Sequence, residues 1–156
     1  LAYALLEMLE RKPLKKITVT ELLTETGVSR RTFYSYFRDK NDLICWIYQK
    51  RVLDACMNEP DDNLFISPEY YEKLKHYRIF VTQSCKIEGQ NNLPEYIFLS
   101  AREYLEQKCD EGAESGFFAE YHASAIAHMC VIWILDGMKV SSGQMASQMG
   151  QMLKKT

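Results

Sequence analysis

The feature that most constrains this chain is the spacing of Gly27 and Ser29, which are separated by a single residue. Glycine is favoured just after a helix, where the backbone often turns left-handed, and serine is favoured just before the first helical turn. Thr18, followed three residues later by Glu21, matches a capping box at the start of the preceding helix. This spacing predicts two short helices, at about 19–26 and 30–37, around a tight turn, a pattern that helix-turn-helix motifs share with many other helix corners.

The rest of the sequence predicts an all-α fold, because period-two alternation is scarce and helix start and stop signals are frequent. We predict a helix-turn-helix DNA-binding domain over residues 1–56, comprising three helices and a linking fourth helix. A helical regulatory and dimerisation domain is predicted over 57–156. Residues 58–63 read as a linker and 110–116 as a loop. Helices are expected at about 1–10, 19–26, 30–37, 40–57, 68–85, 94–109, 119–137 and 142–154.

The third predicted helix has two different faces. At 100° per residue, Phe33 and Phe37 lie on one face, while Arg31, Thr32 and Ser35 lie on the opposite one. The first face anchors the helix in a core. The second suits the major groove of DNA, where an arginine bonds guanine and small hydroxyl side chains contact base edges. With neighbouring groups that reach phosphates, the predicted DNA-binding residues are Thr20, Ser29, Arg30, Arg31, Thr32, Tyr34, Ser35, Tyr36 and Lys40.

Residues 17–44, "ITVTELLTETGVSRRTFYSYFRDKNDLI", resemble the helix-turn-helix of the TetR/AcrR family of bacterial transcriptional regulators. The departure is Arg31, where the family often has glycine or another small residue. The resemblance implies a non-enzymatic regulator that binds a palindromic operator as a homodimer. It also implies repression that a small-molecule effector releases. Two alternatives stay open: activation in place of repression, and control of the C-terminal domain by a protein partner.

The charge distribution agrees with a DNA partner for the first half only. Residues 1–56 hold ten lysines and arginines against seven acidic residues, whereas residues 57–156 hold nine against fourteen. A positive excess on one half is typical of a region that meets a polyanion. No nucleophile-elbow, zinc-protease or nucleotide-binding motif is present, so an enzyme or carrier with a coincidental helix-turn-helix is the weaker hypothesis.

The five cysteines have wide spacing and form no CxxC pair, which favours reduced thiols in a cytoplasmic protein. The longest apolar run, residues 129–135, is too short to cross a bilayer. No cofactor is expected. The spacing of His122 and His128 does not put both on one helical face, so no metal site is expected either.

Two groups of apolar residues have two interpretations each. Methionine-rich positions near the C-terminus fit either the core or a dimer seam formed by the last two helices, the arrangement that the family resemblance implies. The predicted seam residues are Met129, Ile132, Trp133, Met145, Met149 and Met152. Aromatic residues of the middle helices fit either the core or an effector pocket. The predicted pocket residues are Tyr77, Phe80, Phe98, Tyr104 and His128.

Overall fold

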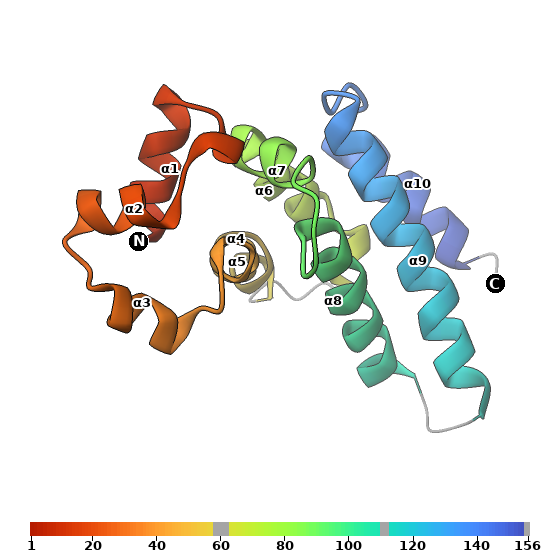
Figure 1. Cartoon of the computed structure of the whole chain (residues 1–156). Coiled ribbons are helices and arrows are strands. Elements are labelled where there is room, and N and C mark those ends of the chain that lie inside the picture. Colours follow the sequence, from red (N-terminus) through yellow and green to blue (C-terminus); the bar gives the residue numbers. More distant parts are fainter. Residues whose placement is uncertain (58–62, 110–112, 155–156) are drawn as a thin grey trace.

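The structure is a computed structural model that describes residues 1–57, 63–109 and 113–154. Every regular element within those ranges is helical, which confirms the predicted all-α class (Figure 1). Most of the predicted linker, residues 58–62, lies outside the described residues, as do residues 110–112 of the predicted loop. The helices near the N-terminus and the last two helices lie at opposite ends of the molecule (Figure 1).

The first three helices begin and end close to the predicted residues, and the fourth begins where it was predicted to begin. They are α1 (Ala2–Arg11), α2 (Val19–Thr26), α3 (Arg30–Tyr36) and α4 (Lys40–Tyr48), with a short 3-10 turn, η1 (Leu14–Lys16), between the first two. Thr18 and Glu21 form the predicted capping box, and Gly27 adopts a φ of 68°. The side chain of Ser29 caps α3, and that of Asp39 caps α4. The predicted capping box, the left-handed Gly27 and the Ser29 cap are therefore confirmed.

The long helix that begins at Lys40 contains a feature that the sequence did not predict. Its α-helical geometry changes to a π-helical turn, η2 (Gln49–Leu53), and then returns in α5 (Asp54–Cys56). The backbone N–H of Asp54 donates to the carbonyl of Gln49, five residues earlier. π turns are rare and occur frequently at functional sites.

The C-terminal part contains η3 (Leu64–Ile66), α6 (Pro68–His76), α7 (Arg78–Ser84), α8 (Leu93–Lys108), α9 (Ala113–Leu135) and α10 (Ser142–Lys154). The predicted helix 68–85 is interrupted at Tyr77, whose φ of −96° and ψ of 28° leave the α-helical region. The helix α9 starts at Ala113, six residues before the predicted start, since alanine and glutamate at positions 113 and 114 have high intrinsic helix propensity.

One continuous hydrophobic core joins the two halves of the chain. Its centre holds the fully buried rings of Phe65, Tyr70 and Tyr71 together with Tyr48 from α4. The hydroxyls of Tyr48 and Tyr70 lie 2.7 Å apart, and the Tyr70 hydroxyl lies 3.6 Å from the sulfur of Cys130 in α9. Each of these two tyrosine hydroxyls therefore has a partner, as most polar groups in an apolar interior do. All five cysteines are free thiols.

One described helical stretch, Ser115–Leu135 of α9, is long and apolar enough to cross a membrane by length and composition. Polar residues such as Glu120, His122 and His128 interrupt the stretch, so no long uninterrupted apolar run indicates it in the sequence. In the structure, 44% of the apolar window is buried inside the protein, and core helices of soluble proteins meet the same criterion. The stretch is therefore weak grounds for a membrane span.

Candidate DNA-binding surface and ligand cavity

Helix α3 is held in place by aromatic packing on its inner face. Phe33 is fully buried, and its ring lies 5.1 Å from the ring of Tyr34 and 5.5 Å from that of Phe37. Phe37 in turn meets Trp46 of α4 edge to face, at 6.0 Å between ring centroids. Edge-to-face pairs add to the stability of simple apolar burial. This packing sets which side of α3 faces outward.

The predicted outward face of α3 is exposed. Arg31, Thr32, Ser35, Tyr34 and Tyr36 all lie on the surface, and Tyr36 is 75% exposed. Two hydroxyls are held locally, because the Ser35 hydroxyl donates to the Thr32 carbonyl at 2.6 Å and the Ser29 and Thr32 hydroxyls lie 2.8 Å apart. Arg31 forms no hydrogen bond or ion pair with any described residue, so its guanidinium is available to a partner.

Arg30 and Thr20 connect the two helices of the motif. The guanidinium of Arg30 donates to the Thr20 hydroxyl at 2.9 Å, which links the start of α3 to the first turn of α2. Both residues are exposed. They therefore remain predicted DNA contacts and also help to fix the angle between α2 and α3.

The side chain of Lys40 is hydrogen-bonded within the protein and does not extend freely toward solvent. Its Nζ atom donates to the carbonyls of Leu14 and Ile17, at 2.9 and 2.8 Å. The side chain is partly buried, and burial lowers the pKa of its ammonium group. Lys40 thus ties the start of α4 to the segment between η1 and α2, while its third N–H can still meet a phosphate.

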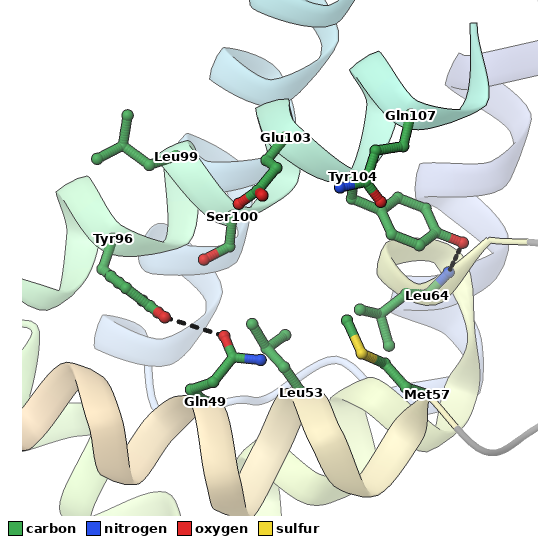
Figure 2. A pocket seen from close by; sticks show the side chains of 10 residues that line it. All are labelled: Gln49, Leu53, Met57, Leu64, Tyr96, Leu99, Ser100, Glu103, Tyr104 and Gln107. Atoms are coloured by element: carbon green, nitrogen blue, oxygen red, sulfur yellow. Dashed lines mark hydrogen bonds between the residues drawn. The ribbon is translucent and has the colours of Figure 1, made fainter.

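A cavity of 370 Å³ lies between α8 and the continuous helix formed by α4, η2 and α5 (Figure 2). The hydroxyl of Tyr96 donates to Gln49 Oε1 at 2.9 Å, and Gln49 Nε2 donates to Asp54 Oδ1 at 2.6 Å. The Tyr104 hydroxyl accepts from the backbone N–H of Leu64 at 3.1 Å. The cavity is lined by Gln49, Leu53, Met57, Leu64, Tyr96, Leu99, Ser100, Glu103, Tyr104 and Gln107.

The predicted pocket residues do not come together, and only Tyr104 lines this cavity. Tyr77 and Phe80 line a separate hollow of 460 Å³ between α1 and the α6–α7 junction. Phe98 packs partly buried against the core, and His128 is exposed on α9. The prediction placed them together by residue type alone. A sequence signal for the observed lining existed, since Tyr96, Ser100 and Tyr104 recur every four residues along α8.

The predicted dimer residues divide into two groups. Met129, Ile132 and Met152 are 46%, 46% and 63% exposed. In contrast, Trp133, Met145 and Met149 are buried inside the protomer, where the indole N–H of Trp133 donates to the Val140 carbonyl at 2.9 Å. Their side chains pack within the chain's own core and do not face outward. Sequence reasoning missed three exposed apolar residues of α9, which are Phe117, Tyr121 and Leu135.

No group of three or more metal-ligating side chains occurs among the described residues. His122 is buried against Phe118, at 4.2 Å between ring centroids, and its Nε2 atom has no hydrogen-bond partner. Burial lowers the pKa of this imidazole, which favours its neutral form. His122 thus packs as an aromatic side chain in this fold.

Comparisons with known proteins agree with this geometry. Residues 3–44 match the family described as "Bacterial regulatory proteins, tetR family", and residues 66–155 match "Transcriptional regulator C-terminal region". A curated relative, the HTH-type dhaKLM operon transcriptional activator DhaS of Lactococcus lactis subsp. lactis (strain IL1403), is 23% identical over 141 residues, 81% of this chain and 73% of the relative. The solved structure of "Dihydroxyacetone kinase operon activator DhaS" has the same fold, with a TM-score of 0.67 and 21% identity over 99% of this chain and 92% of that one.

Proposed function

This chain belongs to the TetR family of DNA-binding transcriptional regulators, and we propose that it is a homodimeric repressor released from its operator by a small-molecule effector. Residues 1–56 bind the DNA, and residues 57–156 hold the effector and the dimer contact. Because the family is one of bacterial regulatory proteins, the proposal includes a cytoplasmic location, where bacterial DNA lies. Each part of the proposal rests on a different surface of the molecule.

The observation that carries the DNA-binding part is the contrast between the two faces of α3. Phe33 is fully buried, whereas Arg31 and Ser35 are exposed on the other side and Arg31 has no partner among the described residues. A helix anchored in this way presents a cation and small hydroxyl groups to the major groove. Bidentate bonding of Arg31 to a guanine would supply base preference, and Tyr36 and Lys40 would hold the phosphates.

The exposed face of α9 supports the homodimer. Phe117, Tyr121, Met129, Ile132 and Leu135 form an exposed apolar stripe along this helix, and its opposite face packs in the protomer core. A helix that is apolar on all sides is normally covered on all sides. A second copy related by a two-fold axis would cover both stripes at once and place two α3 helices on a palindromic operator.

The position of the cavity supports control by an effector. Its walls are α8 and the helix that begins at Lys40, directly after α3. A ligand that competes for Gln49 and Tyr96 would disturb the π turn at 49–53 and tilt α4, which would carry α3 with it. Such a ligand lowers DNA affinity only if it prefers the conformation that does not bind DNA.

Activation is the second candidate, and the specific observation that favours it is the name of the relative. DhaS is described as an operon activator. The same surfaces would serve an activator, with the ligand or a protein partner favouring the DNA-bound conformation. A reporter gene under the operator separates the two, because deletion of a repressor raises expression and deletion of an activator lowers it.

Selection of bound sequences from a randomised duplex library tests the DNA-binding proposal. We expect one palindromic sequence to be enriched. The Arg31→Ala variant should then lose about 1–3 kcal/mol of binding free energy at that sequence. It should bind scrambled duplexes with the same affinity as the unmodified protein. The matched control is Lys139→Ala, an exposed cation on the distant α9–α10 turn. If Arg31→Ala selects the same sequence with the same affinity, the assignment of α3 as the reading helix is wrong.

A further inference from the structure

The cavity between α8 and η2 is divided into a polar side and an apolar side. Figure 2 shows Ser100 and Glu103 pointing from α8 toward the space between the helices, with the rings of Tyr96 and Tyr104 on either side. Leu53, Met57 and Leu64 lie across this space and form its apolar side, and Leu99 lies on α8 at its edge (Figure 2). At 370 Å³ the cavity falls within the range of small-molecule sites, about 300–1,000 Å³. A fitting ligand therefore has a polar part and an apolar part.

Glu103, which is exposed, is the one acidic or basic side chain among the residues that line this cavity. It forms no ion pair with any described residue, whereas the neighbouring carboxylates do. Asp54 pairs with Lys50 at 2.7 Å, and Glu106 pairs with Arg102 at 2.9 Å. The cavity thus holds a carboxylate whose charge is not compensated by a described partner.

The lining disfavours anionic ligands on electrostatic grounds. It contains no lysine, arginine or histidine, although the ammonium of Lys108 lies beside the ring of Tyr104. A carboxylate or phosphate placed beside Glu103 would meet a charge of the same sign, and like charges at close range are repulsive. The chemistry of the site therefore points to a ligand of the opposite sign.

The tyrosine rings provide a second feature suited to a positive charge. The ammonium of Lys108 lies 5.7 Å from the centroid of the Tyr104 ring, so this ring already accepts a cation. Burial raises the pKa of the Tyr96 phenol, and the carboxylates of Asp54 and Glu103 act in the same direction. Burial is the main cause of this shift, and the nearby carboxylate of Glu103 would also attract a cation bound beside Tyr96.

Within the proposed effector function, on which this inference rests, we propose that the cavity binds a small organic cation. Its charged group lies against Glu103 and a tyrosine ring face. Its apolar body contacts Leu53, Met57 and Leu64, and any hydroxyl or amine N–H bonds Gln49 or Ser100. The positive charge is the selective feature, because the remaining contacts suit many small amphipathic molecules.

Calorimetric titration of the full chain with three ligands of one shape class tests the proposal. The probes are benzyltrimethylammonium, benzyl alcohol and phenylacetate, which share an aromatic body and differ in charge. We expect the cation to bind most tightly and phenylacetate not to bind. Glu103→Gln should weaken the cation about three- to tenfold and leave benzyl alcohol unchanged. The control is Glu106→Gln, a carboxylate of α8 outside the lining, which should bind the cation as before.

Three results would overturn the inference: binding of phenylacetate as tight as that of the cation, unchanged affinity in Glu103→Gln, or binding of none of the three probes. Operator binding is measured on the same samples by fluorescence anisotropy, which keeps the two proposals apart. If the protein binds its operator but not the cation, the cation site is wrong and the DNA-binding proposal stands. If the cation binds without changing operator affinity, the site exists but is not the effector site.

Discussion

Lys40 Nζ lies 2.8 Å from the main-chain oxygen of Ile17, which joins the first turn of α4 to the residue just before the capping box of α2. Leu14 accepts a second hydrogen bond from the same ammonium group. Helix α3 follows α2 and precedes α4 in the chain, so the relative positions of α2 and α4 determine where α3 lies. A single side chain thus connects stability with DNA recognition.

Replacing Lys40 with methionine keeps the aliphatic stem and removes the two hydrogen bonds. We expect Lys40→Met to lower the free energy of unfolding by about 1.5–3 kcal/mol, the typical range for a charged hydrogen bond. Affinity for all duplex sequences should fall together, and the salt dependence should flatten by about one phosphate contact. Urea denaturation and anisotropy titrations measure both effects. A variant with unchanged stability would show that the tether contributes nothing.

The contacts of the Glu21 carboxylate predict that the stability of the fold around α2 decreases in acid. The side chain of Lys12, and next the capping contacts with Thr18, lower its pKa from 4.5 to about 2. A carboxyl group whose pKa is lower in the folded state stabilises the fold above pH 4.5 and loses that contribution as the pH falls toward 2. Glu21→Gln should therefore show a smaller loss of stability over this window than the unmodified protein does.

Lys12→Met serves as the companion variant, because Lys12 is the largest cause of the shift. It should also flatten the acid dependence, though less than Glu21→Gln does, since Thr18 still contacts the carboxylate. Thermal unfolding followed by circular dichroism from pH 6 to pH 2 measures all three proteins. Parallel curves would show that Glu21 ionisation is not linked to folding.

The buried hydroxyl pair of Tyr48 and Tyr70 predicts that mutations of the two residues change the free energy of unfolding non-additively. Tyr70→Phe leaves the Tyr48 hydroxyl without its partner in the core and should cost about 1–3 kcal/mol. The double variant Tyr48→Phe/Tyr70→Phe should cost less than the sum of the single changes, because it removes both polar groups. Urea denaturation measures the cycle, and Tyr36→Phe on the surface provides an additive reference. Strict additivity for the buried pair would contradict this account.

The π turn predicts a local change when the hydroxyl of Tyr96 is removed. Tyr96→Phe keeps the ring but takes away the donor to Gln49 Oε1. We expect faster amide hydrogen exchange at residues 49–54 and no change at residues 70–74 of α6, which serve as the internal reference. Unchanged exchange at 49–54 would mean that α8 does not hold the π turn in place.

The apolar stripe on α9 predicts that a charged side chain placed within it prevents dimerisation. Ile132→Glu puts a charge at the middle of the proposed dimer contact, where it would be desolvated next to the same charge of the partner. We expect sedimentation equilibrium to show a dimer for the unmodified protein and a monomer for this variant. Gln90→Glu, exposed in the loop between α7 and α8, is the control. If the unmodified protein is a monomer at all accessible concentrations, the proposed homodimer is wrong.

Much of the N-terminal half could be predicted, because its signals act over three or four residues. Thr18 with Glu21, Gly27, Ser29 and Asp39 each specify a helix end through a local hydrogen bond or a local backbone angle. Residue identities in 17–44 also carried the family resemblance that the comparisons confirm. The cavity lining was missed because it depends on which face of α8 meets η2.

The sequence by itself determined the helical class, the helix-turn-helix and the two faces of α3, since these follow from periodicity and capping chemistry within one helix. Only the tertiary structure decided that Trp133, Met145 and Met149 belong to the core while Met129 and Ile132 face outward. The same holds for the two hydrogen bonds of Lys40 and for the π turn at Gln49. Apolar side chains of similar character become buried or exposed according to how helices distant in sequence pack, and no local pattern contains that information.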